Sequence, residues 1–316
     1  MSLNKPIWKL RNWIDINKLN PELLSLNEDA INILIKNPEK IKWDYISYNK
    51  NSYDILKNNL DKINWNIISY NENLIDILKQ NKDKINWDNL SKNINAIEIL
   101  KENPEKINWY NLSLNKNAKE LFEKNPDRIN WIYISRNYKD IKFLKDNILK
   151  IDWYSLSLNP YAIEILKENK DKINWTNLSR NINAIEILKE NKDKIDWKNL
   201  SRNKNAIEIL KENKYKINWR SLSENKNAIE ILKENKDKIN WNNLSLNKNA
   251  IEILKENQNK INWNNLSRNQ SIFVLDYEKM RIQNQDIYEE LIKEVMKPSR
   301  VFKNPEYDYL EELFGD

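Results

Sequence analysis

A tryptophan recurs every 22 residues along most of this 316-residue chain. No insertion interrupts the series, whose members are Trp43, Trp65, Trp87, Trp109, Trp131, Trp153, Trp175, Trp197, Trp219, Trp241 and Trp263. A fixed period of about 20 to 50 residues is typical of a solenoid, in which each unit buries its apolar face only against its neighbours. The sequence therefore predicts an all-α fold, an elongated alpha-solenoid of about twelve 22-residue repeats.

Two helices are expected in each unit, as in residues 181–197, NINAIEILKENKDKIDW. The first helix is predicted over about residues 182–190, with Asn181 as its N-cap, because a short side-chain acceptor satisfies a free backbone N–H. Asn191 is expected to end this helix in the left-handed conformation, which asparagine tolerates better than most residues. A turn and a shorter second helix follow, over about residues 197–201, with Asp196 as its N-cap.

The recurring tryptophans are predicted to form the structural core, because one buried indole removes about 150–250 Å² from water. At about 25 cal/mol per Å², this burial corresponds to roughly 4–6 kcal/mol of transfer free energy in each unit. A serine follows each tryptophan by four residues and an asparagine by six, as in Trp197, Ser201 and Asn203. Small polar residues at every period are more often backbone caps and hydrogen-bond ladders than ligand contacts. We therefore predict a structural role for both series.

The two ends of the chain depart from the repeat. Residues 1–20 are predicted to be an N-terminal cap, residues 21–277 the solenoid, and residues 278–316 a C-terminal helical cap, since a solenoid needs covered ends. The last helical segment of the solenoid is expected over residues 271–277, and the C-terminal cap should contain helices near 285–296 and 306–314. The most divergent internal unit, residues 131–152, has Asp140 in place of the usual alanine. It is interpreted as a bend, a partner site or simple drift.

The repeat unit has the pattern NAIEILKEN-x-DKI-[ND]-W-x-x-L-S-x-N, between an opening segment LRNWIDINKLN and a closing segment EELIKEVMKPSRVFK. With these features the chain resembles the tandem 22-residue Trp/Asn repeat proteins of giant amoeba-infecting DNA viruses of the mimivirus type. The similarity covers nearly the whole chain. Departures are Pro21 in a tryptophan position and lysines such as Lys170 where family-like units often place proline. The resemblance implies a viral protein acting in an infected host cell, and implies no particular activity.

The composition argues against catalysis. The chain contains no cysteine and no histidine, which excludes thiolate chemistry, the commonest general base and the commonest neutral metal ligand. Its single glycine, Gly315, excludes a glycine-rich phosphate loop. No apolar run is long enough for a signal peptide or a membrane span. We therefore expect a non-enzymatic, intracellular protein without cofactor, metal or membrane contact that is not secreted. The resemblance implies a location in the host cytoplasm or the virion.

Function is expected to reside in the positions that vary while the scaffold repeats. In the short helices, the residues one and five positions after each tryptophan are i,i+4 neighbours that point away from the core. Around the middle of the chain these positions are apolar and aromatic, a residue type enriched at protein interfaces. They predict a protein-binding ridge of Tyr110, Leu114, Ile132, Tyr133, Tyr154 and Leu158. The alternative interpretation is that these are ordinary surface residues without a binding role, or that their side chains pack on neighbouring units.

A second surface hypothesis comes from charge. The 53 Lys and Arg residues exceed the 47 acidic residues by six, which is basic without being decisive. A basic stripe at the same helical positions is predicted from Arg180, Lys198, Arg202, Arg220 and Arg268, and it would follow a phosphate backbone. The leading hypothesis is thus a scaffold for protein–protein interaction, with nucleic-acid binding or a structural, self-assembling virion component as alternatives.

Overall fold

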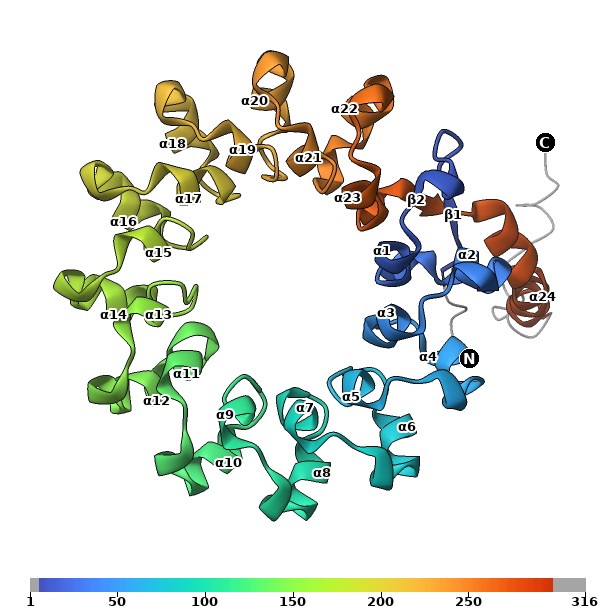
Figure 1. Cartoon of the computed structure of the whole chain (residues 1–316), viewed down its shortest axis with the longest axis horizontal. Helices are drawn as coiled ribbons and strands as arrows, with labels where there is room; N and C mark the ends of the chain where they lie inside the picture. Colours follow the sequence, from blue (N-terminus) through green and yellow to red (C-terminus); the bar gives the residue numbers. More distant parts are fainter. Residues whose placement is uncertain (1–5, 298–316) are drawn as a thin grey trace, which may run out of the picture. The chain divides into compact units, whose positions relative to one another are not determined.

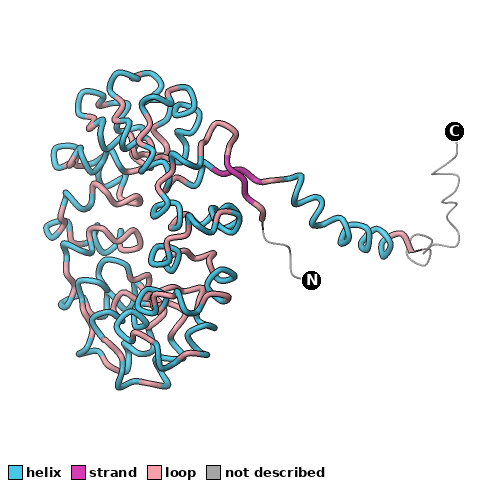
Figure 2. The backbone as a smooth tube through the Cα atoms, turned by 45° about the vertical axis from the view of Figure 1, so that its right-hand side comes forward, coloured by secondary structure: helices cyan, strands magenta, loops and turns pink. Residues whose placement is uncertain are grey.

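In a computed structural model, residues 6–297 of the chain are described, and they form two units. Residues 11–272 make the first unit, and residues 6–10 with 273–297 make the second. The first unit consists of 22-residue helical repeats arranged in a ring of two layers (Figure 1). The prediction of an all-α solenoid is confirmed. Figure 2 shows that this ring contains helix and loop only, while both strands belong to the other unit.

The inner layer consists of the short helices that begin at the tryptophans. They are α1 (Pro21–Ser25), α3 (Trp43–Tyr48), α5 (Trp65–Ile68), α7 (Trp87–Lys92), α9 (Trp109–Leu112), α11 (Trp131–Asn137), α13 (Trp153–Leu156), α15 (Trp175–Leu178), α17 (Trp197–Arg202), α19 (Trp219–Leu222), α21 (Trp241–Leu244) and α23 (Trp263–Ser267). Each begins at its tryptophan, except α1, which begins at Pro21. Except in α3, the side chain of the preceding Asn or Asp caps the helix. In α17 the Asp196 carboxylate accepts a hydrogen bond from the backbone N–H of Asn199 at 2.8 Å, which confirms the predicted N-cap.

The outer layer consists of the other helix of each unit. These helices are α2 (Ile31–Lys36), α4 (Tyr53–Lys57), α6 (Ile75–Gln80), α8 (Ile97–Glu102), α10 (Lys119–Lys124), α12 (Ile141–Asp146), α14 (Ile163–Glu168), α16 (Ile185–Glu190), α18 (Ile207–Glu212), α20 (Ile229–Glu234) and α22 (Ile251–Glu256). They are shorter than predicted. Asn181 caps a turn rather than the helix, since its side-chain oxygen accepts from the N–H of Asn183 at 3.1 Å, and α16 begins only at Ile185.

The predicted left-handed helix end is wrong. Asn191 has φ −132° and ψ 55°, and no residue in the described part of the chain has positive φ. Its side-chain amide donates to the carbonyl oxygen of Ile187 at 2.8 Å. Its backbone N–H donates to the carbonyl oxygen of Leu188. Asparagine therefore ends the helix by satisfying a free carbonyl with its side chain, so the left-handed turn is not needed.

The prediction that the tryptophans form the core is also wrong in part. All eleven are only half-buried, whereas Leu200, Ala184 and their equivalents are inaccessible to solvent. A cation from the following unit lies 4.5–5.6 Å from the ring centroid of each tryptophan, as Lys216 does over Trp197 at 4.7 Å. The indoles thus join successive units with one face against a lysine or arginine, a favourable cation–π arrangement that keeps the charge near water.

The serine and asparagine series form the predicted ladders. Ser179 donates to the carbonyl oxygen of Trp175 at 2.8 Å and accepts from the N–H of Asp196 in the next unit at 2.9 Å. The buried Asn181 donates from Nδ2 to the carbonyl oxygens of Ser157 (3.1 Å) and Asn159 (3.0 Å) in the unit before. Polar groups inside the repeat stack are therefore satisfied between units, which fixes the register of one unit on the next.

The solenoid is not elongated, because its two ends meet. Lys18 lies over the Trp263 ring at 5.1 Å, and the backbone N–H of Asn20 donates to Oγ of Ser267 at 2.8 Å. These are the contacts that join consecutive units elsewhere. Residues 11–20 are therefore not a cap. The 3-10 turn Ile16–Lys18 and the buried Leu19 supply the second half of a twelfth repeat whose first half is α23. Small rotations between units accumulate to one full turn over twelve repeats.

The second unit begins with a strand pair. The strand β1 (Trp8–Leu10) pairs antiparallel with β2 (Phe273–Leu275), so the helix expected over residues 271–277 is wrong. The sequence SIFVL is rich in β-branched and aromatic residues, and it has a partner strand far away in sequence that the local pattern did not reveal. Asp276 then caps α24 (Tyr277–Val295), which includes most of the helix predicted near residues 285–296. The helix predicted near 306–314 lies outside the described residues.

The divergent unit keeps the 22-residue length but changes its interior. Its inner helix α11 has 7 residues, one more than the next longest inner helices, which leaves Asn137 exposed and buries Tyr138 in its place. Phe143 stacks on Trp131 with ring centroids 5.9 Å apart and meets Tyr138 edge-on at 5.3 Å. Asp140 caps the outer helix by accepting from the N–H of Phe143 at 3.0 Å. Aromatic packing thus fills the interior of this unit, and Asn159 of the next unit continues the ladder by donating to the carbonyl oxygens of Ser135 and Tyr138, both at 2.9 Å.

Candidate binding surface on the inner helices

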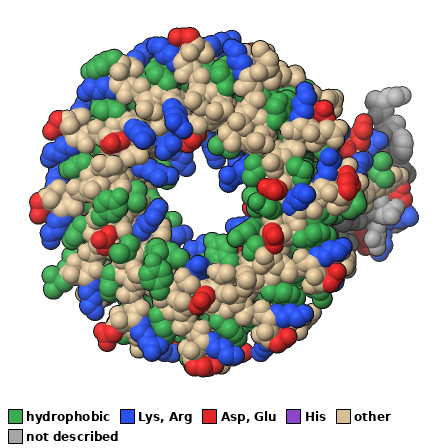
Figure 3. All heavy atoms as spheres, in the orientation of Figure 1, with side chains coloured by type: hydrophobic (Ala, Val, Ile, Leu, Met, Phe, Trp, Pro, Cys, Tyr) green, Lys and Arg blue, Asp and Glu red, His purple; other side chains and the backbone are tan. Residues whose placement is uncertain are grey.

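The inner helices surround the central opening of the ring, which is visible in the space-filling view (Figure 3). In each helix the leucine or isoleucine three residues and the serine four residues after the tryptophan are buried, as are Leu112 and Ser113. The residues one and five positions after the tryptophan lie on the opposite side of the helix and are exposed or half-exposed. The variable positions therefore form the inner surface of the ring.

The predicted ridge lies on three consecutive inner helices, α9, α11 and α13. Tyr110, Ile132 and Tyr154 are 56 %, 54 % and 61 % exposed, whereas Leu114 and Leu158 are only half-exposed. Tyr133 meets Tyr110 edge-on, with ring centroids 5.2 Å apart and hydroxyl oxygens 2.9 Å apart. This hydrogen bond raises the pKa of Tyr133. The two tyrosines hold each other's orientation, so this sector presents a partly ordered aromatic surface.

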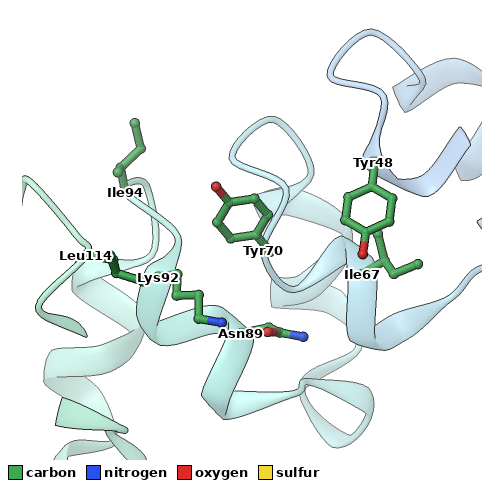
Figure 4. Close-up of a pocket in the computed structure, with 7 residues that line it drawn as sticks. All are labelled: Tyr48, Ile67, Tyr70, Asn89, Lys92, Ile94 and Leu114. Carbon is green, nitrogen blue, oxygen red and sulfur yellow. The ribbon is translucent and has the colours of Figure 1, made fainter. Parts of the chain in front are cut away.

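A groove extends the apolar surface to α3, α5 and α7. It has a volume of about 470 Å³ and is lined by Tyr48, Ile67, Tyr70, Asn89, Lys92, Ile94 and Leu114. In Figure 4 the Tyr70 ring stands between Tyr48 and Ile94, with the amide of Asn89 and the ammonium of Lys92 below. Tyr48 and Tyr70 are about half exposed. The predicted ridge omitted these residues, although they occupy the same position five residues after a tryptophan.

The predicted basic stripe is brought together only in part. Arg180, Lys198, Arg202 and Arg220 belong to three consecutive units, and Figure 3 shows Lys and Arg side chains gathered at the rim of the opening beside α15–α19. Arg268 stands apart, at the end of α23. Arg202 is ion-paired with Glu224 at 3.2 Å. Arg180, Lys198 and Arg220 take part in no ion pair within residues 6–297.

The remaining inner helices have a different character. Glu22, Asp44 and Asp88, each one position after the tryptophan position of α1, α3 or α7, are exposed. The Asp44 carboxylate accepts from the side-chain amide of Asn64 at 2.7 Å, and Asp88 does so from Asn108 at the same distance. Along the inner surface, an acidic and aromatic sector at α1–α7 is followed by a mostly apolar sector at α9–α13, in which Arg136 is also exposed, and by a basic sector at α15–α19.

The outer helices carry compensated charge. The lysines of α8, α14, α16, α18 and α20 each lie 2.9–3.2 Å from the glutamate three residues earlier. Hydrogen bonds from Lys101 and Lys124 lower the pKa of Glu120 to about 2. This shift comes from a surface ion-pair network on α8 and α10, where all three side chains face water, so it does not indicate a catalytic acid.

No cluster of acidic residues within the described part of the chain could hold a metal ion. Among residues 6–297, no helix combines the length and apolar character needed to cross a membrane. Protein-family models, curated proteins and solved structures gave no match to the chain. The arrangement of side chains on the ring is therefore the basis for a functional proposal.

Proposed function

We propose that this protein is a non-enzymatic scaffold whose ring of inner helices holds a segment of a protein partner. The observation behind the proposal is the distribution of exposed apolar side chains. Tyr48, Tyr70, Tyr110, Ile132 and Tyr154 are each more than half exposed and all lie on the inner helices α3–α13. Exposed aromatic residues grouped on one surface are typical of protein interfaces.

The outer surface supports the same conclusion by contrast. Many of its charges are paired within and between helices, as in Lys189–Glu186 at 3.1 Å and Lys192–Glu212 at 3.2 Å. Such pairs keep a surface solvated and add little stability or specificity. Within the ring, the exposed apolar residues outside the inner helices, among them Leu149 and Tyr215, belong to separate units rather than to one patch. The other unit has exposed apolar residues of its own along α24, among them Tyr277 and Ile282. The inner surface is thus the side of the ring that is suited to a partner.

The test is a selection from a displayed library of random peptides with the purified full-length chain as bait. We expect enriched peptides whose synthetic copies bind the chain, and binding should fall at least about thirtyfold when Tyr110, Ile132 and Tyr154 are all changed to serine, because interface anchors contribute about 2 kcal/mol or more each. A matched control changes three exposed apolar residues outside the inner helices, Ile35, Leu149 and Tyr215, to serine. Enriched peptides that bind both variants equally, or a failure to enrich any peptide, would contradict the proposal.

The setting of this binding is also proposed, on the basis of the repeat pattern alone. Its similarity to the repeat proteins of giant viruses favours an infected host cell as the place of action, in the host cytoplasm or in the virion. Mass spectrometry of infected amoebae and of purified virions would locate the protein. Its absence from both would contradict this setting without affecting the binding role.

A further inference from the structure

Basic side chains on the outer and the inner surface of the ring differ in how many of them have an ion-pair partner. The lysines of the outer helices α8, α14, α16, α18 and α20 are paired with glutamates. A cation of the neighbouring unit lies over each of the repeat tryptophans, as Lys194 does over Trp175 at 4.7 Å. On the inner surface, Arg180, Lys198 and Arg220 take part in no ion pair within the described residues. The excess positive charge of the ring therefore includes an uncompensated group beside the opening.

The choice of arginine supports the same point. Only nine of the 53 basic residues are arginine, yet Arg136, Arg180, Arg202, Arg220 and Arg268 all lie in an inner helix or within two residues of its end. The guanidinium group presents a planar fork of donors that matches a carboxylate or a phosphate, whereas the lysine ammonium does not. In a chain that otherwise uses lysine, arginine is thus concentrated where an anionic group would be bound.

The order of the sectors defines what kind of anion fits. The apolar helices α9, α11 and α13 are followed directly by the basic helices α15, α17 and α19. A ligand that covers both must be apolar at one end and anionic at the other. Glu22, Asp44 and Asp88 occupy part of the same inner surface and would repel a phosphate backbone that followed the ring. A polypeptide meets both conditions, whereas a nucleic acid, with a charge at every nucleotide, does not.

We propose that the partner segment is an acidic polypeptide with a neighbouring apolar stretch, an inference that rests on the proposed binding function. Carboxylates of the segment bind Arg180, Lys198 and Arg220. Apolar side chains of the same segment pack on Tyr110, Ile132 and Tyr154. Because the two sectors are adjacent along the ring, charge determines which segments bind and in which direction they lie, while the apolar sector supplies most of the contact area.

The experiment uses the same library of random peptides with three baits: the natural chain, a variant with Arg180→Gln and Arg220→Gln, and a control with Lys189→Gln and Lys211→Gln on the outer helices. The natural chain and the control should enrich peptides in which Asp and Glu are next to Leu, Phe or Tyr. The arginine variant should still enrich apolar peptides but lose the acidic preference. A leading peptide should bind the natural chain at least about tenfold more tightly than its Glu→Gln version, and the difference should shrink as salt is raised.

Each outcome separates the two proposals. Enrichment of apolar peptides without acidic residues, or an acidic preference that survives in the arginine variant, contradicts this inference and leaves the scaffold function intact. No enrichment by any bait contradicts both. Tighter binding of a single-stranded thymidine oligonucleotide than of the leading peptide, measured by fluorescence anisotropy, identifies the basic sector as a nucleic-acid site and overturns the inference. Circular dichroism should show unchanged helix content in both variants, because the replaced side chains are exposed or ion-paired at the surface.

Discussion

Asn27 donates a hydrogen bond from Nδ2 to the carbonyl oxygen of Ser267 at 3.2 Å, although 240 residues separate them in sequence. The same bond joins neighbouring units around the ring, for example from Asn181 to the carbonyl oxygen of Ser157 at 3.1 Å, except at the divergent unit, where Tyr138 takes the place of the buried asparagine. The contact between the first and the last repeat therefore uses the same ladder bond as the other contacts between repeats. At this junction Arg11 also donates from its backbone N–H to the carbonyl oxygen of Ile272 at 3.0 Å and from Nε to that of Ser271 at 2.8 Å.

Ring closure predicts a short distance between positions near the two ends of the ring. The chain has no cysteine, so two introduced cysteines are its only sites for thiol-reactive spin labels. Labels at Lys18→Cys and Asn264→Cys should show the same distance distribution by electron spin resonance as labels at the equivalent neighbours, Lys260→Cys and Asn242→Cys, because Lys18 and Lys260 lie over Trp263 and Trp241 in the same way. A much longer distance for the first pair would show an open solenoid.

Removal of a ladder asparagine is predicted to destabilise the ring strongly. Asn181→Ala removes the side-chain donor of two buried carbonyl oxygens, those of Ser157 and Asn159, of which the second keeps a bond from the backbone N–H of Ala162. The change should cost about 2–4 kcal/mol, since an unsatisfied buried polar group costs about 1–3 kcal/mol and a lost hydrogen bond about 1 kcal/mol. Asn183 is an exposed asparagine of the same unit, and its side-chain amide donates one hydrogen bond, to the carbonyl oxygen of Pro160. Asn183→Ala should therefore cost less than about 1 kcal/mol. Urea denaturation of both variants measures the difference, and equal costs would refute a special role for the buried ladder.

The cation–π series predicts a smaller effect. Lys216→Gln removes the charge over the Trp197 ring and should lower the free energy of unfolding by about 0.5–1 kcal/mol, the range for an exposed cation–π pair. Lys204→Gln, in the same unit but over no tryptophan, is the control.

Because the indoles are half-buried, acrylamide should quench tryptophan fluorescence partly in the native state and more strongly in urea. Equal quenching in the two states would contradict the observed packing.

Tyr138 predicts a gain in stability on mutation. Its buried hydroxyl has no hydrogen-bond partner, and burial raises the pKa of this phenol well above its usual value near 10.0. In the unfolded chain Tyr138 loses its proton above about pH 10, whereas in the folded chain it stays protonated. The free energy of unfolding is therefore unaffected by this group below pH 10 and decreases as the pH rises further. The Tyr138→Phe variant should have a free energy of unfolding about 1 kcal/mol higher than that of the natural chain at neutral pH. Above pH 10 this free energy should fall less with pH than that of the natural chain.

The control for this prediction is Tyr215→Phe, which changes a tyrosine that is 82 % exposed. Thermal melts at pH 8, 9.5 and 10.5 compare both variants with the natural chain. If Tyr138→Phe is less stable than the natural chain and loses stability at the same rate above pH 10, the hydroxyl must have a partner in solution.

The sequence predicted the features that depend on neighbours along the chain. The repeat length, the N-cap at Asp196 and the ladder roles of Ser179 and Asn181 follow from local chemistry that each unit repeats. The half-burial of the tryptophans could have been suspected from the lysine or arginine 19 residues after each one, except Trp263. Without the curvature, however, that spacing does not show which side chains face each other.

Ring closure could not be predicted, because it depends on a small rotation between units that no single residue determines. A slightly different angle would give an open arc from the same pattern. For the same reason the sequence indicated the variable positions after the tryptophans but not that they share one inner surface. The groove at Tyr48 and Tyr70 was missed because its lining comes from four units, α3 to α9, whose proximity follows from the curvature.

A repeat shared between residues 11–20 and α23 also limits how such a chain can evolve. Tandem arrays with free ends tolerate duplication or loss of a unit, since a new unit simply lengthens the stack. Here an extra 22-residue segment would separate Asn27 from Ser267, and a missing one would leave a gap that the existing curvature cannot span. Unequal recombination between these near-identical units should therefore yield defective rings, so that selection keeps their number constant while individual inner-surface residues remain free to change.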